Sequence, residues 1–174
     1  MRRIRYQVAT SLDGYIAGPK GEADWIIMDP DIDFRALFAQ FDACLIGRRT
    51  FEGMARGKKK PGAMPGMKTL VFSRTLRQRD YPKVTIVADN AEETVTALRA
   101  EESGKDIWLF GGGLLFRSLL DAGVVDTVEV AVMPVLLGGG IPLLPAGDRS
   151  AKLTLTGHKV YPKTGIVSLE YAAK

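Results

Sequence analysis

The stretch Asp106-Ile107-Trp108-Leu109-Phe110-Gly111-Gly112-Gly113 leads directly into Leu114-Leu115-Phe116-Arg117-Ser118-Leu119-Leu120-Asp121-Ala122-Gly123. It predicts a buried strand, a turn of three glycines and an apolar-striped helix that ends at glycine. Glycine leaves no Cβ in the way of a group that approaches the backbone closely. The start of the helix offers unpaired N–H groups and the positive end of its dipole, which favour a phosphate. This junction indicates a nucleotide site, although a tight turn also needs glycine.

Two further strand ends carry phosphate-binding chemistry. Leu45-Ile46-Gly47-Arg48-Arg49-Thr50-Phe51-Glu52 predicts a strand, a glycine and a first helical turn whose arginine and threonine can bond a phosphate. Leu70-Val71-Phe72-Ser73-Arg74-Thr75 predicts a strand that ends in serine and arginine. Ligands of open α/β sheets bind outside the carboxyl ends of the strands. Three such ends predict one extended dinucleotide site, the alternative for the arginines being solvated surface charge.

The order of the elements predicts the fold class. Short apolar or β-branched runs between turn signals predict strands. They lie near 3–9, 42–47, 68–73, 84–87, 106–110 and 126–133, with a closing pair at 152–159 and 165–172. Strands alternate with helices through most of the chain, and strands alone finish it. This order predicts an α/β fold with a mixed, mainly parallel sheet, helices on its faces and a carboxyl-terminal antiparallel hairpin.

Four segments have helical patterns. The first follows Asp29-Pro30-Asp31, where proline is set for the first turn. Its apolar stripe consists of Phe34, Leu37, Phe38 and Phe41. The other three run from Gly47 to about residue 54, from Asn90 with Glu93 at capping-box spacing, and over 114–122.

The composition is that of an ordinary globular protein. The chain has 174 residues, of which 46% are hydrophobic and 25% charged, so we expect one domain over 1–174. No apolar run approaches the length of a membrane span. The amino terminus has the charge of a signal peptide but not its long apolar stretch or its cleavage site. We therefore expect a cytoplasmic protein that does not enter a membrane.

Cysteine and histidine are too scarce for two common kinds of active site. The single cysteine, Cys44, lies in an apolar run and is expected in the core. One cysteine and one histidine, His158, provide no metal-ligand spacing, so no metal site is expected. A Ser-His-Asp triad would need His158, and no Gly-x-Ser-x-Gly elbow is present.

The basic charge points to an anionic ligand. The net charge is +4 and the pI about 9.2, and the basic residues gather around 48–60 and 74–79. Such local excess fits a single anionic molecule at least as well as a nucleic acid, and no RNA-binding motif or zinc finger accompanies it. A nucleic-acid binder that uses Arg56-Gly57-Lys58-Lys59-Lys60 is therefore the weakest functional hypothesis, and we expect no nucleic-acid partner.

These motifs together resemble a known family. Ile46-Gly47-Arg48-Arg49-Thr50-Phe51, Ser73-Arg74 and Phe110-Gly111-Gly112-Gly113 resemble the dihydrofolate reductase superfamily in their order and approximate spacing. Val8-Ala9-Thr10-Ser11-Leu12-Asp13-Gly14-Tyr15-Ile16-Ala17 and Pro134-Val135-Leu136-Leu137-Gly138-Gly139-Gly140 are more similar to the riboflavin-biosynthesis reductase branch. The resemblance implies a sheet of about eight strands, four flanking helices and an NADPH-dependent reductase.

The resemblance also implies which residues bind NADPH. The residues that it assigns to the pyrophosphate and the 2′-phosphate are Gly47, Arg48, Arg49, Thr50, Ser73 and Arg74. From the triple glycine and the following helix it adds Gly112, Gly113, Leu114 and Leu115. The nicotinamide ring would lie against Thr10, Ile16 and Ala17. Two arginines near the 2′-phosphate favour NADPH over NADH.

A reductase of this kind positions the hydride and needs a proton donor for the neighbouring atom, directly or through water. Asp13, Asp31 and Asp33 are candidates, and Asp33 best copies the helix acid that binds the pteridine in dihydrofolate reductases. Asp33 could equally favour the helix dipole, and Asp13 could be an Asx turn. Trp25 resembles a tryptophan near the substrate in the family, and a core position is its alternative.

The sequence departs from both branches of the superfamily. Phe110 stands where riboflavin-pathway reductases often have an acid, and the zinc deaminase often fused to them does not fit this chain. The leading hypothesis is hydride transfer to a pteridine- or pyrimidine-like molecule, as in 5-amino-6-(5-phosphoribosylamino)uracil reductase. Dihydrofolate reductase is the enzymatic alternative, and a non-catalytic NADP-binding protein is the alternative of another class. The resemblance also implies a homodimer, through the carboxyl-terminal strands.

Overall fold

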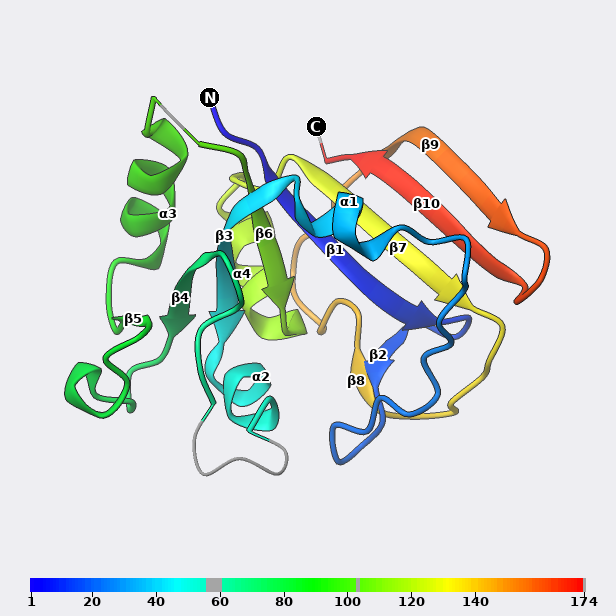
Figure 1. Ribbon diagram of the computed structural model, residues 1–174, viewed down its shortest axis with the longest axis horizontal. Helices are drawn as coiled ribbons and strands as arrows, with labels where there is room; N and C mark the ends of the chain where they lie inside the picture. Colours follow the sequence, from blue (N-terminus) through cyan, green and yellow to red (C-terminus); the bar gives the residue numbers. More distant parts are fainter. Residues whose placement is uncertain (56–60, 103, 174) are drawn as a thin grey trace.

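A computed structural model describes residues 1–55, 61–102 and 104–173. Figure 1 shows the strands and helices of this part of the chain. The strands are β1 (Ile4–Ser11), β2 (Tyr15–Ala17), β3 (Phe41–Gly47), β4 (Lys68–Phe72), β5 (Thr85–Val87), β6 (Asp106–Gly111), β7 (Thr127–Met133), β8 (Ile141–Pro142), β9 (Thr154–Tyr161) and β10 (Ile166–Ala172). The helices are α1 (Phe34–Phe38), α2 (Arg48–Gly53), the short 3₁₀ helix η1 (Gln78–Asp80), α3 (Ala91–Ala100) and α4 (Gly113–Asp121).

Eight of these strands form the main sheet, in the order β5-β4-β3-β6-β1-β7-β10-β9. Neighbouring strands from β5 to β7 are parallel, whereas β10 is antiparallel to both β7 and β9. The predicted mixed sheet with its carboxyl-terminal hairpin is therefore confirmed. The hairpin turns at Gly165, whose φ of 77° lies in the region that favours glycine.

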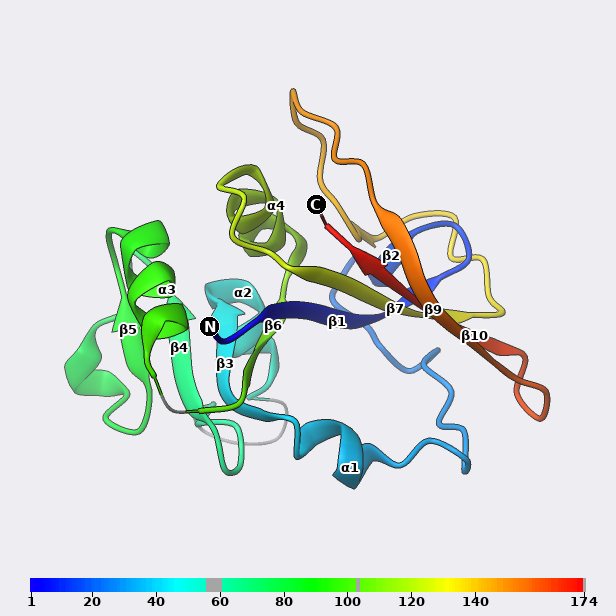
Figure 2. The same ribbon diagram turned by 90° about the horizontal axis from the view of Figure 1, so that it is seen from above.

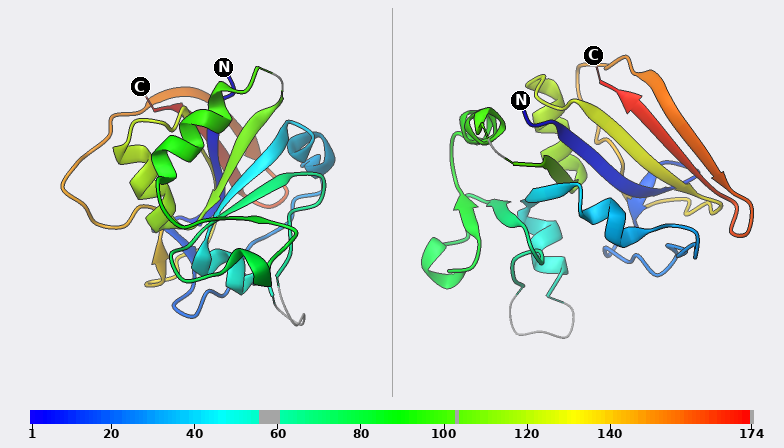
Figure 3. Two further views of the ribbon diagram at one scale, coloured as in Figure 1. Left: turned by 90° about the vertical axis from the view of Figure 1, so that its left-hand side faces the viewer. Right: turned by 45° about the horizontal axis from the view of Figure 1, so that its top comes forward.

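The helices cover the two faces of the sheet. Helices α3 and α4 lie on one face and α1 lies on the other (Figures 2 and 3). Residues of α3 and α4 belong to the largest buried cluster, which includes Val95, Leu115, Phe116 and Leu119. Phe51 of α2 belongs to a second cluster, with Phe41, Ile46 and Trp108. Cys44 is buried in this cluster as expected, and burial raises the pKa of its thiol to about 12.

Two local predictions were wrong, and two short strands were not predicted. Helix α1 ends at Phe38, and Phe41 is instead the first residue of β3, where its ring packs 5.9 Å from that of Trp108. Asn90 precedes α3 with φ 54° and ψ 44°, and its side chain makes no capping hydrogen bond. Asparagine tolerates this left-handed conformation, but a side-chain cap requires an extended one. The sequence also did not predict β2 and β8, which are too short to show a periodicity.

Candidate functional site

A cavity of about 1770 Å³ runs along the carboxyl edge of the parallel strands. It reaches from the ends of β4 and β5, past α2 and α4, to the floor made by β1 and β7. Single small-molecule sites usually occupy about 300–1000 Å³. This cavity is therefore large enough for two molecules side by side.

One part of the cavity is bordered by the first turns of α2 and α4. Gly47 caps α2 and Gly112 caps α4, and neither end has a side-chain capping bond. The first N–H groups of any helix have no intrahelical acceptor and form its electropositive end, and here no capping side chain accepts from them either. The two caps are neighbours, because a Cβ built on Gly47 would lie 3.5 Å from the Gly112 nitrogen. This arrangement is suited to a bridging diphosphate.

Arginine side chains border the adjoining part of the cavity. The lining there includes Arg48, Arg49 and Arg74. Nη1 of Arg48 donates to Thr75 Oγ1 over 2.9 Å, so the loop after β4 is tied to α2. Ser73 is only 7% exposed, and its Oγ accepts from the backbone N–H groups of Thr75 and Leu76 at 3.2 and 3.0 Å. Ser73 thus shapes the turn that carries Arg74.

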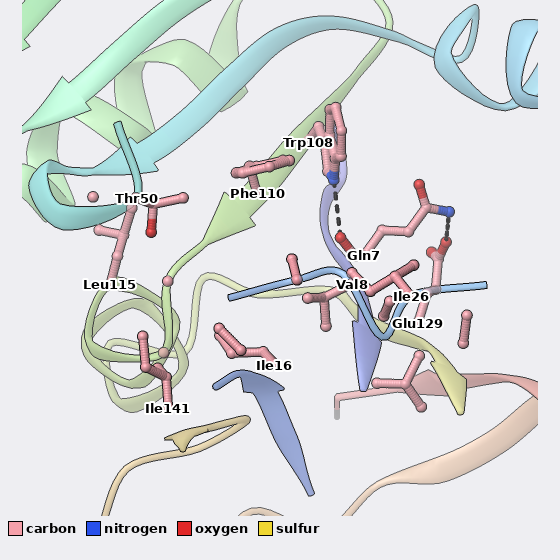
Figure 4. A pocket seen from close by; sticks show the side chains of 18 of the residues that line it. Gln7, Val8, Ile16, Ile26, Thr50, Trp108, Phe110, Leu115, Glu129 and Ile141 are labelled. Atoms are coloured by element: carbon pink, nitrogen blue, oxygen red, sulfur yellow. Dashed lines mark hydrogen bonds between the residues drawn. The ribbon is translucent and has the colours of Figure 1, made fainter. Parts of the chain in front are cut away.

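The main sheet opens beside this phosphate-binding part. Strand β1 pairs with β6 only as far as Tyr6 opposite Leu109, but it pairs with β7 as far as Ser11 opposite Met133. Beyond Tyr6, β1 and β6 separate, and the cavity enters the gap between them. Figure 4 shows Val8 and Ile16 on one side of this gap and Leu115 on the other. This gap, here called the slot, has apolar walls and is wide enough to admit a flat ring.

The predicted cofactor residues therefore largely share one cavity. Those that line it are Ile16, Ala17, Gly47, Arg48, Arg49, Thr50, Ser73, Arg74, Gly112, Gly113, Leu114 and Leu115. Thr10 does not line it. Its side chain is buried, and Oγ1 donates to the Tyr15 carbonyl oxygen over 3.2 Å, which fixes the position of β2.

The three residues predicted to act in catalysis do not line the cavity. Asp33 is the N-cap of α1, and its Oδ1 accepts from the Ala36 N–H at 2.9 Å. Asp13 accepts from Ser11 Oγ at 2.6 Å and from two backbone N–H groups at 137 and 138. Trp25 packs in a third cluster and donates to the Glu22 carbonyl oxygen. The geometry gives each a local structural partner, and their catalytic roles stay predictions.

The hydrogen bonds to Asp13 affect its acid–base behaviour. The Ser11 hydroxyl and the N–H groups of Leu137 and Gly138 hold the pKa of the Asp13 carboxyl below its usual range. A carboxyl group of this kind is ionised at neutral pH and therefore has no proton to give. The Asx-turn interpretation describes its place better than proton donation does.

The cavity floor contains a polar cluster that the sequence motifs did not indicate. Glu129 of β7 lies opposite Gln7 of β1, and both line the cavity. Arg5 binds Glu129 through two hydrogen bonds of 2.7 Å. Burial lowers the pKa of Arg5, but the bonds to Glu129 and Asp106 outweigh it, so the net pKa is raised and the guanidinium is charged. A glutamate in the middle of an otherwise apolar strand, Thr127–Met133, was the available signal.

The described residues contain neither a metal-ligand cluster nor a membrane-spanning helix. In ranges 1–55, 61–102 and 104–173, no group of three or more histidine, cysteine, aspartate or glutamate residues could hold a metal ion. No helix in the same ranges has both the length and the apolar character needed to cross a bilayer. The basic segment 56–60, which the nucleic-acid hypothesis used, lies outside the described residues.

Known proteins are similar to this chain in sequence and in fold. The model of the RibD C-terminal domain family matches residues 2–167. The uncharacterized protein YyaP of Bacillus subtilis (strain 168) is 34% identical over 180 aligned residues, covering 98% of this chain and 94% of YyaP. The crystal structure of a putative riboflavin biosynthesis protein from Shewanella sp. PV-4 superposes with a TM-score of 0.82 and 26% identity, covering 100% of this chain and 99% of that one.

A solved structure of lower sequence identity identifies the fold. Dihydrofolate reductase from Enterococcus faecalis, complexed with NADP(H) and RAB-propyl, matches with a TM-score of 0.66 and 19% identity. The match covers 98% of this chain and 94% of the reductase. At this identity the likeness shows the fold alone, and the predicted dihydrofolate reductase-like fold is confirmed.

Proposed function

The chain belongs to the RibD C-terminal domain family, and on that premise we propose that it is an NADPH-dependent reductase of a pteridine- or pyrimidine-like heterocycle. One observation carries the proposal. Two helix N-termini, three arginines and an apolar slot in the sheet all border one cavity. The family assignment supports reductase chemistry, and the proposal adds the cofactor and the substrate class.

The donor groups of the cavity fit NADPH. The uncapped N–H groups at the start of α2 and α4 suit its diphosphate, because they offer hydrogen bonds and a positive dipole end. The guanidinium groups of Arg48 and Arg74 suit the 2′-phosphate, which NADH lacks. The slot between β1 and β6 suits the nicotinamide ring. Three neighbouring regions thus match three parts of the same molecule, in the order in which they are linked.

The chain's own residues would bind, orient and exclude water. When bound, NADPH supplies the hydride. Ile16 and Val8 would hold the ring flat in the slot, with the open floor of β1 and β7 on its far side. Phe34, Leu37 and Phe38 of α1 line the cavity above that floor and would exclude water from the reacting atoms. None of the residues of α1 is buried by the protein itself, so this face is free for a ligand.

Proton delivery would proceed through solvent. Both Glu129 oxygens already accept hydrogen bonds from other side chains of the protein, namely Arg5, Gln7 and Thr127. The acids named from the sequence lie outside the cavity, so water is the simplest remaining carrier. If Asp33 is nevertheless the donor, Asp33→Asn will lower kcat at unchanged NADPH affinity, whereas the solvent route predicts unchanged kcat.

The chain would also form a homodimer. Strand β9 is an edge of the main sheet, and its Leu155 and Val160 are 52% and 57% exposed. Edge strands with exposed apolar side chains favour pairing with another chain. Light scattering should give twice the chain mass of 18.9 kDa, and Val160→Glu should reduce it to that of a monomer. A monomeric wild type contradicts this part of the proposal.

The deciding experiment combines binding with turnover. We expect NADPH to quench the fluorescence of Trp108, which lines the cavity, more strongly than equal concentrations of NADH, and Trp108→Phe to remove most of the quenching. NADPH oxidation would then be followed with 5-amino-6-(5-phosphoribosylamino)uracil and with dihydrofolate. Turnover of dihydrofolate alone would favour the enzymatic alternative. NADPH binding without turnover of any heterocycle would favour a non-catalytic NADP-binding protein, and equal affinity for the two cofactors would contradict the role of the arginines.

A further inference from the structure

The two shortest strands, β2 and β8, form one side of the cavity next to the slot. They pair with each other, with Tyr15 opposite Pro142 and Ala17 opposite Ile141. Ile16 and Ala17 of β2 line the cavity, and so do both residues of β8. Figure 4 shows Ile16 and Ile141 near the start of α4. The β2–β8 pair therefore borders the part of the cavity that is suited to the nicotinamide ring.

The β2–β8 pair also packs against the end of α4. A Cβ built on Gly113 would lie 2.7 Å from the Pro142 carbonyl oxygen. A Cβ built on Gly112 would lie 4.0 Å from Ile16 Cδ1. Both strands thus contact the backbone at the first turn of α4. A shift of the pair would change the distance between the side of the slot and the helix end that is suited to the diphosphate.

The carboxylate of Asp13 joins the chain before β2 to the chain before β8. Its Oδ1 accepts from Ser11 Oγ at 2.6 Å and from the Leu137 N–H at 3.1 Å, and its Oδ2 accepts from the Gly138 N–H at 2.7 Å. Asp13 and Gly138 are 125 positions apart in the sequence. One side chain therefore links the two distant segments that supply the β2–β8 pair.

Backbone hydrogen bonds join the same two segments on either side of this link. The Leu12 N–H donates to the Val135 carbonyl oxygen and the Leu143 N–H donates to the Gly14 carbonyl oxygen, each over 2.9 Å. Between these two bonds, the Asp13 carboxylate is the acceptor for N–H groups of the facing segment. Hydrogen bonds to an ionised acceptor are about twice as strong as bonds between neutral groups. Asp13 is therefore expected to fix the segment that continues into β8.

We propose that Asp13 is a positioning residue that holds the β2–β8 pair in the place needed by the nicotinamide ring of NADPH. The pair is then already in position when the cofactor arrives, so binding does not have to order it, and this preorganisation increases affinity. Asp13 acts through Ile16 and Ile141 and touches neither cofactor nor substrate. The inference rests on the proposed function and gives Asp13 a role other than proton donation.

The test compares NADPH with 2′-phospho-ADP-ribose, a fragment that has the same structure but lacks the nicotinamide ring. The amide of Asp13→Asn has one acceptor oxygen, so its NH₂ group must face the N–H of either Leu137 or Gly138. The β2–β8 pair should therefore loosen beside the ring. We expect the affinity for NADPH to fall about fivefold or more and that for the fragment to change less than about twofold, as measured by calorimetry.

A matched control separates positioning from stability. The Asp42 carboxylate also links distant segments, because it accepts from the Lys105 N–H at 2.8 Å and pairs with Arg2, but it does not line the cavity. Asp42→Asn should lower the urea midpoint and keep the wild-type ratio of the two affinities.

A milder variant covers the case in which Asp13→Asn does not fold. Ser11→Ala removes one of the hydrogen bonds to Asp13 and should weaken NADPH binding relative to fragment binding by about twofold. If Asp13→Asn is unfolded, an unchanged ratio in Ser11→Ala overturns the inference.

The outcomes distinguish this inference from the proposed function. A folded Asp13→Asn protein that keeps the wild-type ratio overturns the inference, and so does equal weakening of both ligands. A wild type that binds NADPH and the fragment with equal affinity also overturns it, although the cofactor assignment then stands. Failure of the wild type to bind either molecule overturns the proposed function itself. A ratio that falls in Asp13→Asn but not in Asp42→Asn supports the inference.

Discussion

The part of the cavity beside α2 and α4 and the part floored by β1 and β7 are built differently. Beside the helices, the groups offered to a ligand are backbone N–H groups at two glycine caps, each set by a few consecutive residues. In the floor they are side chains, and the bonds from Gln7 and Arg5 to Glu129 join residues 122 and 124 positions apart. The first part depends on local sequence, whereas the second exists only after the sheet has assembled. We expect mutations to separate the two.

The largest effect is expected in the floor. Glu129→Leu leaves the buried Arg5 guanidinium without its main partner and should cost about 3 kcal/mol of unfolding free energy. Urea denaturation followed by circular dichroism measures this. Arg3→Met is the matched control, because the Arg3 side chain is 58% exposed and its ion pair with Asp106 should contribute less than about 1 kcal/mol. Equal losses in the two variants would refute the distinction.

Adding one methyl group at Gly112, the N-cap of α4, tests whether NADPH must approach the backbone closely there. A Cβ on Gly112 would lie 3.0 Å from Thr50 Oγ1, so Gly112→Ala must move the Thr50 side chain and occupies space between the α2 and α4 caps. NADPH affinity should fall about tenfold, which corresponds to about 1.4 kcal/mol. Gly62→Ala is the control, since a Cβ there would meet nothing within 4 Å. Unchanged affinity in Gly112→Ala, measured by fluorescence titration, would show that the close approach is not required.

The arginine border should show a smaller and more selective effect. Arg74 is exposed and lines the cavity, so Arg74→Ala should weaken NADPH binding about fivefold and NADH binding less than about twofold. Arg77→Ala removes an exposed charge outside the cavity lining and should change neither. Parallel titrations with both cofactors give the two ratios. Equal weakening for both cofactors would mean that Arg74 does not contact the 2′-phosphate.

The smallest effect concerns stability at acid pH, through the hydrogen bond between Asp29 and Thr164. Asp29 accepts a 2.6 Å hydrogen bond from Thr164 Oγ1, which lowers the pKa of the Asp29 carboxyl. Because the folded pKa lies below the unfolded one, this contribution is complete above the unfolded value of about 3.9 and is lost as the pH falls below it. Thr164→Val should therefore reduce stability at pH 7 more than at pH 3. Urea midpoints at both pH values provide the measurement, and a difference that grows on acidification would contradict it.

Local motifs made much of the fold predictable. The helices after Gly47 and Gly112 begin within a residue of their predicted positions, and the predicted strands appear with shifted ends. Predictions failed where a distant contact decided the outcome. Phe41 continues the helical stripe in the sequence, but it packs against Trp108 as part of β3. The separation of β1 from β6 is likewise a matter of register between strands about a hundred residues apart, and no local pattern encodes it.

By itself, the sequence determined the order of the main-sheet strands and the helices, the glycine caps of α2 and α4, and the arginines that follow Gly47 and Ser73. These features follow from backbone freedom at glycine and from helix-end polarity, both of which act over a few residues. Only the tertiary structure decided that Asp13 accepts from the backbone N–H groups of Leu137 and Gly138. It also decided that the Gln7 amide donates to Glu129, a carboxylate on the neighbouring strand. Hydrogen bonds between side chains depend on which strands become neighbours, and that is known only once the sheet has formed.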